Sequence, residues 1–195
     1  MASPYRLFFI RHGETDWNAE GRLQGQQDIP INERGRHQAG EAGKRLLRLA
    51  PQAGTLPWVV SPLWRTRDTA ERARRAIGLD PMDYALDPRL KEISFGDWEG
   101  HTWRDLRKVA PHAAEERKAD KWRFVPPGGE SYAMLAERIR PFAEELAGEQ
   151  VVVAHGGVAR ALLYLLSGVS DLVAPSVEIW QGRVLLFENG RFAWT

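Results

Sequence analysis

Histidine and arginine stand directly after apolar, strand-like runs at three places in the chain. Arg11-His12-Gly13 follows the first such run, Arg65 comes shortly after a second, and His155-Gly156-Gly157 follows a third. In open α/β sheets, the loops at the carboxyl ends of the strands form the ligand site. The three loops are therefore predicted to bring two imidazoles and two guanidinium groups to one edge of a sheet.

This set of side chains suits a tetrahedral oxyanion, above all a phosphoryl group, because guanidinium forks and imidazole N–H groups donate hydrogen bonds to its oxygens. A single histidine after a strand is more often structural, and an arginine in the first turn of a helix is usually solvated. Two Xaa-His-Gly strand ends within 195 residues are harder to explain in that way. The residues alone predict an anion site.

The elements that must position these residues alternate along the chain. Strands are predicted at residues 5–10, 58–60, 82–86 and 151–154, with an antiparallel hairpin at 176–194 that carries the turns Gln181-Gly182 and Asn189-Gly190. Helices are predicted at residues 32–50, 63–76, 102–118, 129–147 and 158–167. The alternation predicts a three-layer α/β/α sandwich with a mostly parallel central sheet and an antiparallel edge.

The length of 195 residues favours one domain spanning residues 1–195. Residues 87–129 are less regular than the rest and rich in tryptophan, charge and proline. We expect this segment to form a small helical, cap-like insertion over the site, although an irregular solvated segment would have the same composition.

Composition excludes several classes of function. The chain has no cysteine, which excludes thiolate zinc sites, iron–sulfur clusters, a cysteine nucleophile and disulfides. The net charge of +1 argues against a nucleic-acid or polybasic membrane-binding module, although 22 of the 27 basic residues are arginine. No apolar run is long enough for a signal segment or a membrane span. A cytoplasmic protein is expected, with no nucleic-acid or membrane partner.

Five sequence motifs resemble, in order, those of the histidine phosphatase superfamily, which includes the cofactor-dependent phosphoglycerate mutases. Each motif alone is weak, but the ordered set covers nearly the whole chain. The motifs are Arg11-His12-Gly13-Glu14-Thr15-Asp16-Trp17-Asn18, Ser61-Pro62-Leu63-Trp64-Arg65-Thr66-Arg67-Asp68-Thr69-Ala70, Leu90-Lys91-Glu92-Ile93-Ser94-Phe95-Gly96-Asp97-Trp98-Glu99-Gly100, Pro127-Gly128-Gly129-Glu130-Ser131 and Val153-Ala154-His155-Gly156-Gly157. Leu23-Gln24-Gly25 through Asp28-Ile29-Pro30 also resembles the stretch that follows the first motif.

The resemblance implies a role for each matching residue. His12 would attack phosphorus and form a phosphohistidine, and Glu92 would protonate the leaving group and then activate water. Three further residues would hold the transferring oxygens, and three would contact the substrate. The first group is Arg11, Arg65 and His155, and the second is Asn18, Gln24 and Gly156.

From the residues alone, Glu92 could equally be a surface carboxylate that pairs with Lys91 or Arg89. No histidine–carboxylate spacing is typical of a metal site, and the arginines can supply the electrostatic work of a metal. We therefore expect neither a catalytic metal nor a cofactor.

Two alternatives to a phosphatase stay open. Mutases of the family resemble one another in an arginine and a His-Tyr-Gly run after the acid, whereas here Ile93-Ser94-Phe95-Gly96 follows Glu92. The alternative is nonetheless a cofactor-dependent phosphoglycerate mutase, with Arg104, Arg107, Arg117 or Arg123 for a second anionic group. A binding module for phosphorylated ligands, without turnover, would be expected to lack the nucleophile or the acid.

The substrate is expected to be a small-molecule phosphomonoester. Aromatic residues near the predicted mouth would suit an aromatic or sugar-bearing ester if several line it; the alternative is that most of them pack in the interior. These residues are Trp64, Phe95, Trp98, Trp103, Trp122 and Phe124. The terminal hairpin also offers an edge for a homodimer.

Overall fold

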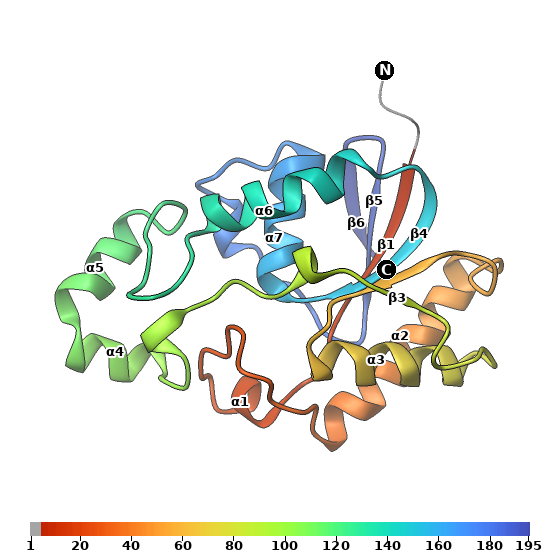
Figure 1. Cartoon of the computed structure of the whole chain (residues 1–195), viewed down its shortest axis with the longest axis horizontal. Helices are drawn as coiled ribbons and strands as arrows, with labels where there is room; N and C mark the ends of the chain where they lie inside the picture. Colours follow the sequence, from red (N-terminus) through yellow and green to blue (C-terminus); the bar gives the residue numbers. More distant parts are fainter. Residues whose placement is uncertain (1–4) are drawn as a thin grey trace.

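The central element is a mixed β-sheet. Over residues 5–195, which the computed structural model describes, the strands are β1 Tyr5–Arg11, β2 Trp58–Val60, β3 Ala85–Leu86, β4 Gly148–Ala154, β5 Val184–Glu188 and β6 Arg191–Trp194. Their order in the sheet is β3-β2-β4-β1-β5-β6 (Figure 1). The first four strands are parallel, whereas β5 and β6 pair antiparallel at one edge. The predicted sheet is confirmed.

Helices connect the strands and cover both faces of the sheet. They are α1 Asp16–Ala19, α2 Glu33–Leu49, α3 Trp64–Ala76, α4 Trp103–Val109, α5 Pro111–Ala119, α6 Tyr132–Glu144 and α7 Gly156–Ser167. Short 3₁₀ turns occur at Pro88–Leu90, Gly96–Trp98 and Ala174–Ser176. Between residues 5 and 195, no helix has the length and apolar character needed to cross a bilayer.

Side chains of the central strands alternate between two apolar cores. In β1, Leu7 and Phe9 pack in the core formed with α6 and α7, whereas Phe8 and Ile10 pack in the core formed with α2 and α3. Successive strand residues point to opposite faces, so a strand that is apolar throughout must be covered on both sides. The two helical layers lie on opposite sides of the strands in Figure 1, and the three-layer α/β/α sandwich is confirmed.

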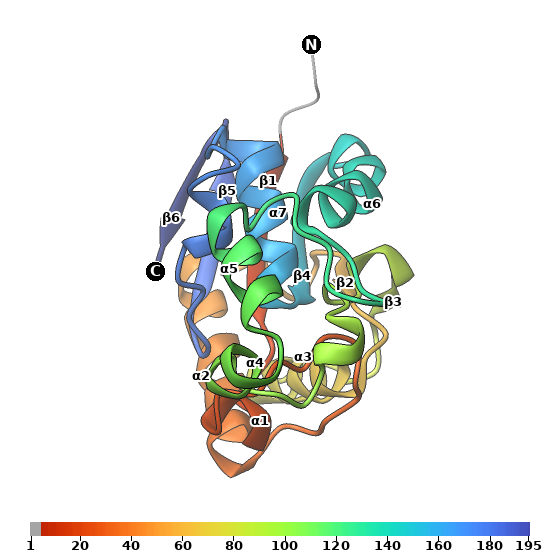
Figure 2. The same ribbon diagram turned by 90° about the vertical axis from the view of Figure 1, so that its left-hand side faces the viewer.

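The segment at residues 87–129 carries α4 and α5, which project from one end of the molecule in Figure 1 and face the viewer in Figure 2. The prediction of a single helix at 102–118 is wrong. Helix α4 ends before Ala110, whose backbone angles are not helical (φ −140°, ψ 57°), and a second helix, α5, begins at Pro111. Proline has no amide hydrogen and disfavours a helical residue before it, but it fits the first position of a helix. A small core of Leu23, Trp98 and Leu106 fastens these helices to the loop after β1.

The terminal hairpin is shorter than predicted. Its strands begin at Val184, and its turn has positive φ angles at Asn189 (50°) and Gly190 (73°), as a two-residue hairpin turn requires. The turn at Gln181-Gly182 lies before the hairpin. The residues from 176 to 183 form a loop whose Ile179 carbonyl accepts a hydrogen bond from Arg11.

Helices α2 and α3 pack so closely that glycine is required at one contact. A Cβ atom at Gly43 would lie 2.3 Å from the carbonyl oxygen of Ala73. Gly40 lies one turn earlier in α2, and a Cβ atom there would meet only the Ala76 Cβ at 3.9 Å. The two glycines therefore form a matched pair in one helix.

We expect Gly43→Ala to lower the free energy of unfolding by about 1–3 kcal/mol, because the added methyl group forces α2 and α3 apart. Gly40→Ala should raise it by about 0.5–1 kcal/mol, since alanine loses less conformational entropy in a helix. Equilibrium urea denaturation measures both. Equal effects of the two substitutions would contradict this account of the packing.

Candidate active site

The carboxyl ends of β1, β2 and β4 meet at one edge of the sheet. β4 lies between the other two, with Val153 in register with both Ile10 and Val60. The residues that follow are therefore neighbours. The cavity at this edge has a volume of about 150 Å³ and is lined by Arg11, His12, Asn18, Arg22, Leu23, Gln24, Gly25, Arg65, Glu92, Ile93, Phe95, Tyr132, Gly156, Gly157 and Arg160.

His12 is buried at the bottom of this cavity. Its Nδ1 lies 2.8 Å from the Gly13 carbonyl oxygen. A carbonyl only accepts, so Nδ1 must carry the proton and Nε2 of the neutral ring has a free lone pair. Burial, followed by the charges of Arg65 and Arg11, holds the pKa of His12 well below its usual value. The ring is therefore neutral near pH 7.

Arg11 and Arg65 are fixed by main-chain carbonyl groups. Arg11 Nη1 donates to Ile179 O at 2.7 Å, and the two terminal nitrogens of Arg65 donate to Gln27 O and Gly25 O, each at 2.7 Å. Neither arginine forms an ion pair within residues 5–195. Burial lowers the pKa of Arg11 to about 10 and also lowers the pKa of Arg65, yet both stay charged near neutrality.

Each guanidinium has a buried Nε–H donor without a partner within residues 5–195. Arg11 Nε and Arg65 Nε are buried and have no hydrogen-bond partner in the part of the chain that the structure describes. An unsatisfied buried donor is costly, and two of them on charged groups beside one cavity indicate an anionic ligand. This is the arrangement predicted from the two arginine motifs.

His155 is fully buried behind the cavity and is the one residue of the predicted set that does not line it. Its ring centre is 5.3 Å from that of His12. Nε2 of His155 is 2.7 Å from Ser61 Oγ, and Nδ1 has no partner among the described residues. Burial, with the charges of Arg65 and other cations, keeps the pKa of His155 well below its usual value.

Glu92 is held by the main-chain amides at the start of α7. Gly157 N donates to its two carboxylate oxygens at 3.0 and 3.2 Å, and Ile93 N donates at 2.9 Å. A Cβ atom at residue 157 would lie 2.3 Å from the carboxylate, so only glycine allows this approach. The surface alternative is therefore wrong: Arg89 pairs with Asp87 and Glu145, not with Glu92.

Hydrogen bonds and an ion pair of Arg138 hold the loop that carries Glu92 in place. Arg138 donates to the carbonyl oxygens of Arg89, Lys91 and Glu92 and forms an ion pair with Glu130 at 2.9 Å. The backbone before and after the carboxylate is thus fastened to α6.

The three residues predicted to contact substrate lie on the wall of the same cavity. Asn18 Oδ1 accepts from Thr15 N and from Gln181 Nε2, so its amide group is oriented. Gln24 is buried with its Oε1 unpartnered within residues 5–195. Gly156 is the first residue of α7, where a side chain would touch Arg11 and Arg160.

Several residues at the site were missed by the sequence reasoning, including Arg22, Leu23, Gly25 and Ile93, which line the cavity, and four more that affect its geometry. Tyr132 and Arg160 line the cavity, Gly157 admits Glu92, and Ser61 contacts His155. Gly157 and Ser61 lie within the matching motifs. Arg160 lies one helical turn after Gly156 and therefore on the same face of the helix, so its spacing could have placed it at the site. For Tyr132 the sequence offered no signal.

Most of the aromatic residues considered for the mouth pack in the interior, which is the alternative kept open for them. Of the six aromatic residues proposed for it, Phe95 alone lines the cavity. Trp98 stacks on Phe124 at 5.2 Å, and Trp122 packs on Tyr132 and Tyr164. These rings build the small cores that support the site.

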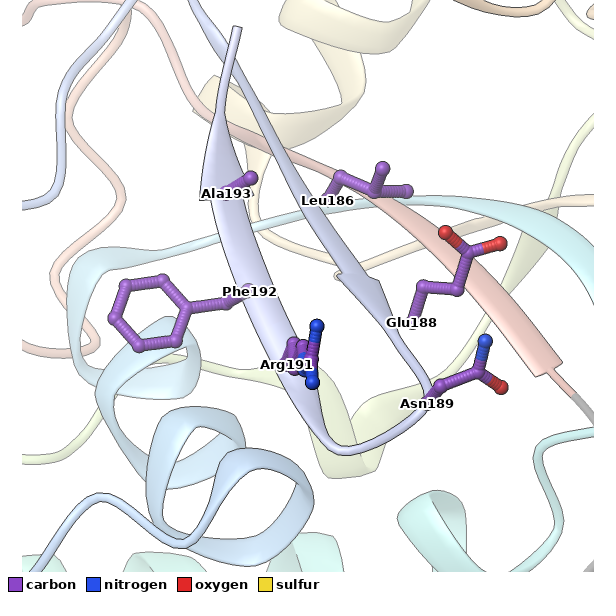
Figure 3. A pocket seen from close by; sticks show the side chains of 6 residues that line it. All are labelled: Leu186, Glu188, Asn189, Arg191, Phe192 and Ala193. Atoms are coloured by element: carbon purple, nitrogen blue, oxygen red, sulfur yellow. The ribbon is translucent and has the colours of Figure 1, made fainter.

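A larger hollow of about 490 Å³ lies on the terminal hairpin (Figure 3). In Figure 3, Phe192 points away from Glu188, and the labelled side chains do not converge. Glu188 is already paired with Arg6. This hollow carries none of the predicted site residues; it is lined by Leu186, Glu188, Asn189, Arg191, Phe192 and Ala193.

The chemistry of the first cavity is that of an oxyanion site beside an unprotonated imidazole nitrogen. Free donors of Arg11 and Arg65 surround it, the amino end of α7 faces it, and a carboxylate stands at its wall. Within residues 5–195, no three histidine or carboxylate side chains are grouped as metal ligands.

Comparisons with known proteins agree with this geometry. The family described as "Histidine phosphatase superfamily (branch 1)" matches residues 7–192. Glucosyl-3-phosphoglycerate phosphatase of Mycolicibacterium vanbaalenii is 36% identical over 176 residues, which cover 84% of this chain and 75% of that protein. A 2,3-bisphosphoglycerate-dependent phosphoglycerate mutase of Parvibaculum lavamentivorans is 30% identical over 199 residues, covering 95% of this chain and 90% of that protein.

Among solved structures, mycobacterial glucosyl-3-phosphoglycerate phosphatase in complex with VO3 superimposes with a TM-score of 0.80 at 32% identity, covering 97% of this chain and 96% of that one. The match spans the sheet, its helical layers and every motif described above. The chain therefore belongs to the histidine phosphatase superfamily, branch 1.

Proposed function

We propose that this protein hydrolyses small-molecule phosphomonoesters through a phosphohistidine formed on His12. The observation that carries the proposal is the pair of free guanidinium donors, on Arg11 and Arg65, beside an imidazole whose Nε2 is unprotonated. The relatives named as phosphatases and the VO3 oxyanion bound by the structural neighbour support it.

In the first step, Nε2 of His12 attacks phosphorus, and the bond between phosphorus and the ester oxygen breaks. Protonated Glu92 gives its proton to that oxygen, so the product leaves as a neutral alcohol. Arg11, Arg65 and the Nδ1–H of His155 stabilise the charge on the transferring oxygens, with Asn18 and Gln24 beside them.

In the second step, ionised Glu92 accepts a proton from water, and the water oxygen attacks phosphorus. The P–N bond breaks, its electron pair returns to Nε2 of His12, and inorganic phosphate leaves. Nδ1 of His12 keeps its proton throughout because it donates to Gly13 O. Glu92 ends protonated, ready for the next ester.

The substrate is proposed to carry a second anionic group. Arg160 is half-buried at the cavity wall, donates to Val177 O and Tyr132 Oη, and forms no ion pair within residues 5–195. Glucosyl-3-phosphoglycerate, the substrate in the name of several relatives, has a carboxylate beside its phosphate. An ester of this class would place that carboxylate on Arg160.

Residues 87–129 are proposed to act as a cap on a single domain. Arg117 of α5 stacks over Trp103 at 4.0 Å and is half-buried without an ion pair among the described residues. It would add positive charge on the cap side of the mouth.

A mutase is the second candidate, since one relative with high coverage carries that name. Efficient isomerisation of 3-phosphoglycerate with 2,3-bisphosphoglycerate would favour it over hydrolysis. A non-catalytic binding module is disfavoured because nucleophile, acid and phosphate ligands are all present. We also propose that the reaction needs no metal and that the protein acts in the cytoplasm without a nucleic-acid or membrane partner. A homodimer through the β6 edge is proposed in the same way.

Wild-type protein mixed with p-nitrophenyl phosphate and EDTA at pH 5 to 8 should release p-nitrophenol and form an acid-labile phosphoenzyme, seen as one added phosphoryl group in intact mass. Labelling should persist near pH 5, where a histidine of ordinary pKa, about 6.5, is mostly protonated, because the pKa of His12 is lowered. His12→Ala should abolish both signals, whereas the exposed His37→Ala should keep them. Turnover by His12→Ala would refute the assignment of the nucleophile.

Glu92→Gln should lower kcat for alkyl phosphates by about 10²–10⁴-fold, because both proton transfers lose their carrier. Formation of the phosphoenzyme from p-nitrophenyl phosphate should fall far less, since that leaving group barely needs a proton. A burst of p-nitrophenol followed by slow turnover is therefore expected in stopped flow. Equal losses with both substrates and no burst would argue against general acid–base catalysis by Glu92.

Arg160→Met should lower kcat/KM for glucosyl-3-phosphoglycerate by about 10- to 100-fold more than for p-nitrophenyl phosphate. This factor corresponds to the loss of one charge-assisted hydrogen bond, which only the first substrate can make. Arg123→Met is the matched control, because Arg123 is already paired with Asp120 and Asp171. An unchanged ratio between the two substrates would place the second anionic group elsewhere.

A further inference from the structure

We propose that Ser61 is a positioning residue that holds neutral His155 as the Nδ1–H tautomer, so that Nδ1 is a hydrogen-bond donor to the transferring phosphoryl group. The inference rests on the proposed function of the site. It assigns a role to a serine that contacts neither the nucleophile nor the general acid.

The sheet register places Ser61 beside His155. β2 and β4 are parallel neighbours with Val60 paired to Val153, and Ser61 N donates to Val153 O at 3.0 Å. Ser61 therefore follows the last residue of β2 at the level where β4 ends before His155. Both side chains are fully buried, and Ser61 Oγ lies 2.7 Å from His155 Nε2.

The direction of this hydrogen bond follows from the groups available. Ser61 Oγ has no other partner within residues 5–195, and the same holds for Nδ1 of His155. If Ser61 donates to Nε2, the hydroxyl hydrogen is satisfied and the ring proton is on Nδ1. If Nε2–H donated instead, the hydroxyl hydrogen would lack an acceptor and the Nδ1 lone pair would lack a donor. In the Nδ1–H form the one unpartnered group is Nδ1–H, a donor that a bound oxyanion satisfies, which is worth about 1–3 kcal/mol.

The choice of tautomer matters because His155 stays neutral. Burial, followed by the charges of Arg65, Arg11 and Arg138, lowers the pKa of His155, and a proton on the neighbouring His12 would lower it further. A neutral imidazole has a single N–H, and the bond made at one nitrogen decides what the other can do. With the proton on Nδ1, the free side of the ring donates; in the other tautomer it would present a lone pair to phosphate oxygens.

The two histidines then have the same tautomer and opposite uses. His12 donates Nδ1–H to Gly13 O and leaves the Nε2 lone pair for attack. His155 accepts at Nε2 from Ser61 and leaves Nδ1–H for the anion. Two neutral rings thus supply a nucleophile and a donor without adding positive charge beside Arg11 and Arg65.

The tautomer can be measured without turnover. Long-range ¹H–¹⁵N correlation spectra of the full-length, ¹⁵N-histidine-labelled protein at neutral pH distinguish the two forms, and the five histidines make few signals. His155 is assigned by its loss in His155→Asn, and His12, whose tautomer is set by a carbonyl, is the internal reference. We expect Nδ1–H at His155, a perturbed Nδ1–H signal on adding inorganic phosphate, and loss of the tautomer preference in Ser61→Ala. Protonation of Nε2 in the wild type, or an unchanged spectrum in Ser61→Ala, would overturn the proposal even if phosphatase activity is confirmed.

Kinetics test the same link. Ser61→Ala should lower kcat by up to about 10²-fold, at the lower end of the loss caused by removing one donor outright. In a His155→Ala background the further loss should be close to none, because the donor that Ser61 orients is already absent. Melting temperature and circular dichroism check that each variant is folded. The same factor of loss in both backgrounds would show that Ser61 acts independently of His155.

Discussion

The burial of two guanidinium groups without a carboxylate partner is the constraint on which the rest of this structure depends. Arg65 is fully buried and Arg11 has a buried Nε, and neither forms an ion pair within residues 5–195. The carbonyl oxygens that accept hydrogen bonds from the two arginines do not cancel the charge. Burial, followed by the positive potential that remains, keeps both nearby histidines neutral, and that potential makes an anion the natural ligand.

The elements around the site can be understood as ways of meeting that constraint. The loop at residues 25–27 supplies carbonyls to Arg65, and the loop before β5 supplies one to Arg11. Helix α7 begins with two glycines, so its amides can approach a carboxylate on one side and the cavity on the other. The carboxylate of Glu92 is thereby placed at the wall of a cationic cavity without forming an ion pair that would neutralise it.

The support for the site comes from outside the motifs. Arg138 fastens the chain around Glu92 to α6, and the core of Leu23, Trp98 and Leu106 fastens the α4–α5 segment to the loop after β1. Trp98, Trp103 and Trp122 pack in the apolar clusters beside the site, which is why these rings do not line the cavity. A large apolar ring contributes most where it is covered on all sides, and sequence composition does not distinguish that place from a binding wall.

Residue patterns alone were enough to predict the architecture and an anion site. Apolar periodicity predicted the layers, and the residues after the strands, Arg11-His12 and His155, predicted an anion site at one sheet edge. The resemblance added Glu92, which periodicity could not separate from a surface carboxylate. The hydrogen bonds that orient these residues and set their protonation could be seen only in the folded chain. Arg11 bonds to Ile179, which is 168 residues away in the sequence, and Ser61 bonds to His155, which is 94 residues away. Local patterns report which side of an element is buried, whereas the partner of a buried polar atom depends on strand register and loop path, and these exist only once the sheet has formed.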